Sequence, residues 1–95
     1  MPEEPTRIRT YSWQDPRASV DRTRSGKESL MAQRDGHLPT PPFAVTLGMK
    51  LVEVDAGRVV FAMLPTEFQY NPLGVVHGGV IATLMDSAMA CAIQT

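Results

Sequence analysis

The chain has 95 residues, which is enough for one domain and too few for two. Its 9 Lys and Arg residues are balanced by 10 Asp and Glu, which excludes the concentrated basic surface of nucleic-acid-binding proteins. We expect a soluble cytoplasmic protein, because the single cysteine excludes an internal disulfide, residues 1–30 contain no apolar signal region, and the longest apolar stretch is too short to span a membrane.

The first part of the chain divides into a tail and a domain. Residues 1–24 are polar and lack periodicity, which predicts a flexible tail before a domain at 25–95. Ser25, with Glu28 three residues later, has the spacing of a capping box and predicts the start of a short helix. Gly36 is expected to stop that helix.

A β-hairpin is predicted after a proline-rich connector at 38–42, which we expect to be non-helical. From Phe43 onward, apolar residues alternate with others, as in a half-buried strand: Val45, Leu47, Met49 and Leu51. The alternation slips by one residue near Leu51, which predicts a bulge or strong twist. Residues 55–57 are predicted to form a turn. The nearly continuous apolar run at 59–64 predicts a second strand covered on both faces.

A loop and a long helix are predicted in the remaining residues. Residues 66–77 lack a clear period and contain Asn-Pro and Gly, which is typical of a loop. A helix then runs from Gly78 at least to Gln94. It is apolar nearly all round, so we expect it to be buried. Cys91 is expected to be a packing residue of that helix, because no base stands at a workable spacing.

The loop and the helix start share a sequence motif with a known family. The motif N-x-x-G-x-x-H-G-G-x-x-x-x-L-x-D is matched at every fixed position: Asn71, Gly74, His77, Gly78, Gly79, Leu84 and Asp86. In these residues the chain resembles the PaaI-type acyl-coenzyme A thioesterases of the hotdog superfamily, over roughly residues 42–95. The resemblance implies an α+β hotdog fold, in which a curved antiparallel sheet wraps a long central helix. It implies hydrolysis of acyl-coenzyme A thioesters without a metal or redox cofactor.

Two residues of the motif have a chemical rationale of their own. Backbone N–H groups at a helix N-terminus are unpaired and lie at the positive end of the helix dipole, and Gly78 has no side chain to block one. That N–H suits the oxyanion of a thioester intermediate, although glycine is also common in tight turns. Asp86 falls in the middle of the apolar helix, where an unpaired carboxylate is costly. It is expected to be the general base or nucleophile, or alternatively a satisfied core acid.

Roles for three further residues follow from the resemblance. Asn71 would orient the attacking water, although Asn before Pro is also a common turn-former. His77 and Gly79 would belong to the substrate-binding region, with His77 mainly bracing the loop and the start of the helix.

The spacing of Gly78 and Asp86 predicts a site shared between two chains. Eight residues span about 12 Å of helix, whereas reacting atoms must approach within roughly 3–3.5 Å. One helix cannot present both groups to one carbonyl, but two antiparallel helices can. We therefore expect a homodimer or homotetramer, with Gly78 of one chain beside Asp86 of the other.

Other functions remain open from the sequence. In the family further strands follow the central helix, so the chain is expected to stop before its fold is complete and to be unstable as a monomer. A non-catalytic acyl-coenzyme A binding or assembly module, or an inactive fragment of the enzyme, is the main alternative. A hydratase on the same fold is a weaker one. The acyl group is not determined by these residues.

Overall fold

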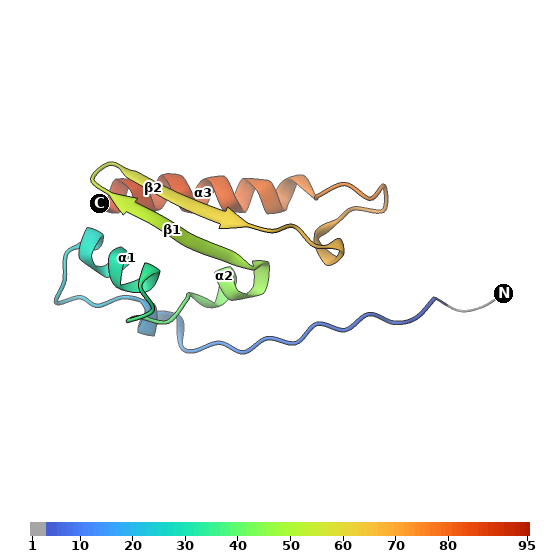
Figure 1. Ribbon diagram of the computed structural model, residues 1–95, viewed down its shortest axis with the longest axis horizontal. Coiled ribbons are helices and arrows are strands. Elements are labelled where there is room, and N and C mark those ends of the chain that lie inside the picture. Colours follow the sequence, from blue (N-terminus) through green and yellow to red (C-terminus); the bar gives the residue numbers. More distant parts are fainter. Residues whose placement is uncertain (1–3) are drawn as a thin grey trace.

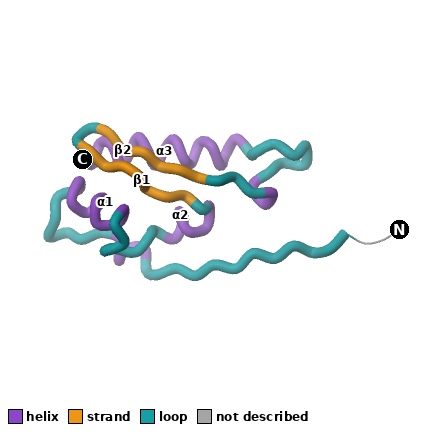
Figure 2. The backbone as a smooth tube through the Cα atoms, viewed as in Figure 1, coloured by secondary structure: helices purple, strands orange, loops and turns teal. Residues whose placement is uncertain are grey.

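The structure is a computed structural model that describes residues 4–95, and it has an α+β architecture. A two-stranded antiparallel sheet has the long C-terminal helix packed beside its second strand and the shorter helices packed beside its first strand (Figure 1). In chain order the elements are η1 (Pro16–Ser19), α1 (Gly26–Arg34), α2 (Pro42–Leu47), β1 (Met49–Asp55), β2 (Arg58–Met63), η2 (Glu67–Gln69) and α3 (Gly78–Gln94), where η marks a 3-10 turn (Figure 2). Within residues 4–95 this is consistent with part of a hotdog fold, and the complete wrapped sheet is not seen.

Helix α1 begins and ends where the sequence predicted. The Ser25 hydroxyl accepts a hydrogen bond from the Glu28 N–H at 3.1 Å, which satisfies one of the unpaired donors of the first turn. The helix ends at Arg34, and Gly36 follows with a φ of 82°, a conformation that favours glycine. Both signals are local, so tertiary packing did not displace them.

The prediction of a strand beginning at Phe43 is wrong, because residues Pro42–Leu47 form helix α2. Pro42 occupies the first turn of this helix, where its missing N–H has no intrahelical partner to lose. Hence the connector at 38–42 is non-helical only up to Pro41. Gly48 ends α2 in the left-handed conformation, with a φ of 73°, and the strand begins at Met49. Over so short a segment, alternating apolar residues do not distinguish a helix from a strand.

The hairpin of β1 and β2 follows the predicted pattern from there. The register shifts between Leu51 and Glu53, which confirms the bulge. The turn at 55–57 is also confirmed, and it leads into β2 at Arg58, one residue earlier than expected. No residue of β2 is buried among the described residues, so the prediction that both its faces are covered is wrong for this chain.

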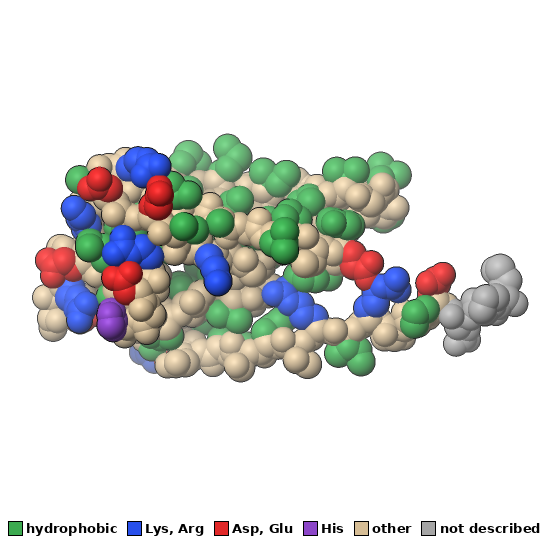
Figure 3. Space-filling model, viewed as in Figure 1, with side chains coloured by type: hydrophobic (Ala, Val, Ile, Leu, Met, Phe, Trp, Pro, Cys, Tyr) green, Lys and Arg blue, Asp and Glu red, His purple; other side chains and the backbone are tan. Residues whose placement is uncertain are grey.

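Helix α3 has the predicted bounds but not the predicted burial. It packs alongside β2 and touches α1 near its C-terminal end. Of its 17 residues only Ser87 is buried. Green side chains along the upper edge of Figure 3, over α3, show this exposed apolar surface, which includes Ile81, Met85, Met89 and Ile93. The apolar composition of α3 therefore does not translate into burial within the single chain.

The C-terminal end of α3 is held against two other elements. The Gly57 N–H at the hairpin turn donates to Thr95 Oγ1 at 2.7 Å. Gly26 at the start of α1 lies so close to the Gln94 carbonyl that a Cβ at this position would overlap it. A glycine in the first turn of α1 is therefore required by the approach of α3.

The segment before α1 makes specific contacts. Ser19 is buried, and its hydroxyl donates to the Pro39 carbonyl at 2.7 Å. Residues 16–19 form the 3-10 turn η1. Residues 1–3 of the predicted tail lie outside the described residues, and its flexibility stays a prediction. Among residues 4–95 no helix is long and apolar enough to cross a membrane.

Candidate active site

The motif loop between β2 and α3 is closed by a small ladder of backbone hydrogen bonds. Tyr70 and Val76 form an isolated antiparallel bridge, and the His77 N–H donates to the Gln69 carbonyl at 2.9 Å. Asn71 organises the turn between them: its side-chain oxygen accepts from the N–H groups of Leu73 and Val75 at 2.9 and 3.3 Å. The structure thus gives Asn71 the turn-forming role, with its side-chain oxygen committed to the loop, and its action on water stays a prediction.

His77 and the two glycines form the N-terminus of α3. His77 is the N-cap, and its Nδ1 accepts a hydrogen bond from the Gly79 N–H at 2.9 Å. Gly79 gives the imidazole room, because a Cβ there would come within 3.1 Å of Nδ1. These contacts give both residues a part in starting the helix, and their contact with substrate stays a prediction.

The Gly78 N–H is the donor that this arrangement leaves available. It has no hydrogen-bond acceptor among residues 4–95, and Gly78 is exposed. A Cβ built on Gly78 would meet no atom within 4 Å, so the space in front of this residue is open. An unpaired N–H at the positive end of a 17-residue helix is suited to an anionic oxygen.

Gln69 positions the motif loop and was not singled out by sequence reasoning. Its side chain is buried, donates from Nε2 to the Leu47 carbonyl at 2.6 Å and accepts from the Thr66 N–H at 3.1 Å. One amide thereby joins the end of α2 to the loop that leads to Gly78. A capping-box pattern of Thr66 and Gln69 was the available sequence signal.

We expect Gln69→Ala to lower the free energy of unfolding by about 1–3 kcal/mol, since it removes a buried side chain together with its hydrogen bonds to the Leu47 carbonyl and the Thr66 N–H. Urea unfolding followed by circular dichroism measures this. Gln14→Ala is the matched control, because Gln14 is exposed and makes no side-chain hydrogen bond among the described residues. Equal stability of the two variants would contradict the anchoring role.

Arg9, from the segment before α1, also contacts the base of the motif loop. Its guanidinium lies 4.0 Å from the centroid of the Phe68 ring and donates to the Thr46 carbonyl at 2.7 Å. Arg7 forms an ion pair with Glu67 beside it. A hollow of about 350 Å³ opens here, lined by residues that include Arg9, Phe68, Gln69 and Val80. The predicted tail therefore supports the loop, which the sequence did not indicate.

Asp86 lies on the exposed surface of α3, so the expectation that it is buried is wrong for the single chain. It has no hydrogen bond or ion pair among residues 4–95. Gly78 and Asp86 belong to one unbroken helix, and the eight-residue separation still corresponds to about 12 Å. The structure therefore does not bring the two together within one chain.

Gly78 and Asp86 do share a row on the helix surface. Positions four residues apart lie on one face, and every member of this row is exposed: Gly78, Ala82, Asp86 and Ala90. The row is flanked by the exposed apolar side chains of Ile81, Met85, Met89 and Ile93. We call these eight residues the α3 stripe. It places one carboxylate within an otherwise apolar and small-residue surface.

Cys91 lies on a different part of α3 and is half-buried. Burial raises the pKa of its thiol, which keeps it in the protonated, weakly nucleophilic form. Among residues 4–95 no three His, Cys, Asp or Glu side chains gather as they would to hold a metal ion.

Comparison with known proteins gives one family. A family model described as Thioesterase superfamily matches residues 73–95, which are 23 of the 95 residues. The match includes Gly74, His77, Gly78, Gly79 and Asp86, and it begins two residues after Asn71. No curated protein and no solved structure gives a significant match. The match indicates thioester hydrolysis in general and does not distinguish the PaaI type or an acyl-coenzyme A substrate.

Proposed function

We propose that the protein hydrolyses acyl-coenzyme A thioesters, in the manner of PaaI-type hotdog enzymes, at sites shared between two copies of the chain. The open Gly78 N–H at the start of α3 carries this proposal. It donates to the thioester carbonyl oxygen and stabilises the negative charge that develops there when water attacks. His77 supports it by accepting the neighbouring Gly79 N–H, which fixes the first turn.

Asp86 of the partner subunit supplies the base or the nucleophile. As a base, its carboxylate takes a proton from water, whose oxygen attacks the carbonyl carbon. The tetrahedral intermediate then expels coenzyme A as a thiolate, which takes up a proton, and the carboxylic acid is released. Asn71 lies in the loop that leads to this site. Its side-chain NH2 orients the water in this proposal.

The α3 stripe supports an antiparallel pair of helices. Ala82 is midway between Gly78 and Asp86, so a two-fold axis at Ala82 sets each Gly78 opposite the partner's Asp86. Gly78, Ala82 and Ala90 are small enough for close helix approach, and the flanking apolar side chains gain burial. Contact with a second helix also explains why an apolar α3 is exposed in one chain.

The oxyanion role is tested by a matched pair of substitutions at Gly78. Gly78→Pro removes the N–H, and the first helical position after extended His77 tolerates proline. Gly78→Ala keeps the N–H and adds a methyl group in open space. We expect kcat to fall about 10²- to 10³-fold in the proline variant. The alanine variant should retain most of its activity. The rates are measured with a panel of aryl- and alkyl-acyl thioesters and a thiol reagent that detects released coenzyme A. Equal rates for the proline and alanine variants would contradict the oxyanion role of the Gly78 N–H.

The antiparallel register is tested by cross-linking. In a Cys91→Ser background, Ala82→Cys places two thiols at the proposed axis, and a short bis-maleimide reagent should join them into a covalent dimer. Ala90→Cys is the control, because these thiols would lie roughly 24 Å apart along the paired helices. Cross-linking of Ala90→Cys in preference to Ala82→Cys would contradict the register.

A non-catalytic acyl-coenzyme A binding module is the second candidate. It is favoured by one observation: within a chain, Asp86 and Gly78 are separated along the helix, and Asp86 has no partner that would activate it. Binding of acyl-coenzyme A by the dimer without release of free thiol would identify this function.

A further inference from the structure

The segment before α1 and the start of α3 border the same hollow, whose volume is about 350 Å³. Arg9 and Tyr11 line the hollow from the segment, and Val80 lines it from the first turn of α3. Figure 1 shows the segment running extended past α2 towards the side of the molecule on which the motif loop lies. We call residues 7–11 the strap.

Arg9 of the strap joins two elements through one side chain. Its guanidinium donates to the Thr46 carbonyl, at 2.7 Å, in the last turn of α2. Carbonyls at the end of a helix lack intrahelical partners, and the helix dipole favours a cation there. The same guanidinium lies 4.0 Å from the centroid of the Phe68 ring in η2, and Arg7 forms an ion pair with Glu67 of that turn. The strap therefore ties η2 to the end of α2 from the solvent-exposed side.

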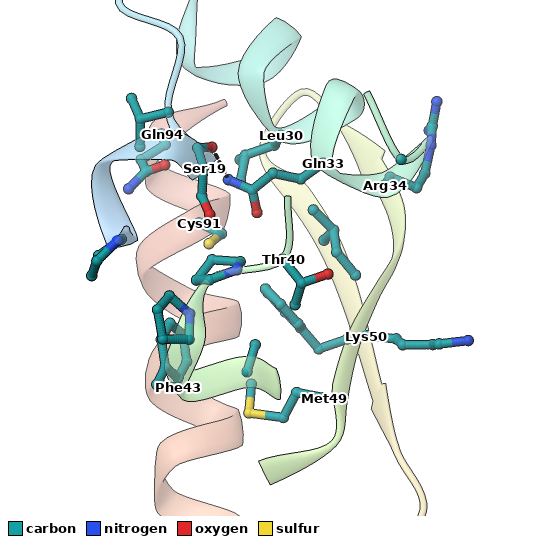
Figure 4. Close-up of a pocket in the computed structure, with 18 residues that line it drawn as sticks. Ser19, Leu30, Gln33, Arg34, Thr40, Phe43, Met49, Lys50, Cys91 and Gln94 are labelled. Atoms are coloured by element: carbon teal, nitrogen blue, oxygen red, sulfur yellow. Dashed lines mark hydrogen bonds between the residues drawn. The ribbon is translucent and has the colours of Figure 1, made fainter. Parts of the chain in front are cut away.

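Helix α2 faces a cavity over part of its surface. This cavity has a volume of about 730 Å³, and Pro42, Phe43 and Ala44 line it from α2 (Figure 4). Side chains that border a void lose the van der Waals contacts that packed neighbours would give. Polar contacts at the C-terminal end of α2 therefore contribute a larger share of what holds this short helix and the turn η2 tied to it.

Two hydrogen bonds connect η2 to the first turn of α3. The Gln69 carbonyl, at the end of η2, accepts from the His77 N–H at 2.9 Å. His77 is the N-cap of α3, and its Nδ1 accepts from the Gly79 N–H at 2.9 Å. Gly78, whose N–H is the available donor, stands between these two residues. A displacement of Phe68 and Gln69 is thus passed on to that donor.

We propose that the strap positions the Gly78 N–H, with Arg9 as the positioning residue and Phe68 as the side chain through which it acts. The effect on thioester hydrolysis rests on the proposed function, whereas the effect on the first turn of α3 does not. An exposed ion pair or cation–π contact contributes little alone. The strap acts because it combines both with a hydrogen bond on the same two elements.

Amide hydrogen exchange followed by NMR tests the strap without any thioester. Arg9→Gln removes the cation, and we expect the His77 N–H to exchange about two- to fivefold faster, the fold-change that corresponds to an exposed cation–π contact. Phe68→Leu should have a similar effect and add little to Arg9→Gln, because both changes remove one contact. Arg22→Gln is the matched control, since Arg22 is exposed and makes no side-chain hydrogen bond or ion pair among residues 4–95.

Two results of the exchange experiment would overturn the proposal. One is an equal rate for the His77 N–H in Arg9→Gln and Arg22→Gln. The other is an equal acceleration at the Asp35 N–H, which bonds to the Met31 carbonyl at the end of α1. That result would mean that the substitution destabilises the whole chain and not the first turn of α3.

Kinetics tests the consequence for catalysis. Arg9→Gln should lower kcat about two- to fivefold at unchanged KM, since the Gly78 N–H acts on charge that develops after the substrate is bound. Arg9→Lys keeps a cation and should restore part of the loss. A raised KM with unchanged kcat would contradict positioning of the donor. If the wild-type chain releases no coenzyme A, the proposed function fails, and the exchange rates alone decide whether the strap holds the first turn of α3.

Discussion

We expect Asp86→Asn to lower kcat for thioester hydrolysis by about 10²- to 10⁴-fold, the usual contribution of a positioned general base. Asparagine has nearly the same shape as aspartate but cannot take a proton from water. Because Asp86 is exposed and makes no hydrogen bond or ion pair among residues 4–95, its replacement should leave the fold unchanged. Steady-state kinetics with the same thioester panel, together with circular dichroism, measure both quantities.

A surface carboxylate outside the matched segment is the control for that variant. Asp35 is exposed at the end of α1 and forms an ion pair with Arg34. Asp35→Asn should keep wild-type kcat. If Asp86→Asn also hydrolyses thioesters at a nearly normal rate, Asp86 is neither base nor nucleophile.

The second prediction is that two inactive variants restore activity when they share a dimer. One subunit carries Gly78→Pro and the other Asp86→Asn, and each homodimer should be at least about 100-fold below wild type. In the heterodimer one site combines the intact Gly78 with the intact Asp86, and the other site contains both substitutions. We therefore expect about half of the wild-type activity for each heterodimer.

Differently tagged subunits, refolded together and purified through both tags, provide the heterodimer for this assay. Tagged wild-type subunits treated in the same way give the reference activity. Rates as low as those of the two parents would show that the site is not shared in the proposed manner. Since the shared site follows from the separation of Gly78 and Asp86 along α3, this result would also require a different base for Gly78 to act with.

Several elements could be predicted from short stretches of the chain. Ser25 and Glu28 determine the start of α1, and Gly36 follows its end, because capping involves residues only a few positions apart. The slip in alternation at Leu51 indicated the bulge for the same reason: register and face are linked within one strand. Helix α2 was missed because its six residues are too few to show a helical period in the sequence. Its start also depends on a proline at the first position.

The chemistry of the candidate site could be predicted only in part from the sequence. The motif from His77 to Asp86 was visible, since its donors and carboxylate are set by residue type and spacing along one helix. The exposure of Asp86 could not be predicted, because it depends on which other elements reach that face of α3. Composition shows that α3 is apolar, but it does not show what covers it.

Local sequence accounts for the helix that begins at Gly78, for its available N–H, and for the separation that keeps Gly78 and Asp86 apart. Those properties depend on backbone geometry and on residues close together in the chain. Tertiary packing accounts for the rest: Gln69 links the motif loop to Leu47, Arg9 supports the loop, and a cavity forms beside Cys91. The two hydrogen bonds join residues 22 and 37 positions apart, and their formation depends on how all the elements pack at once.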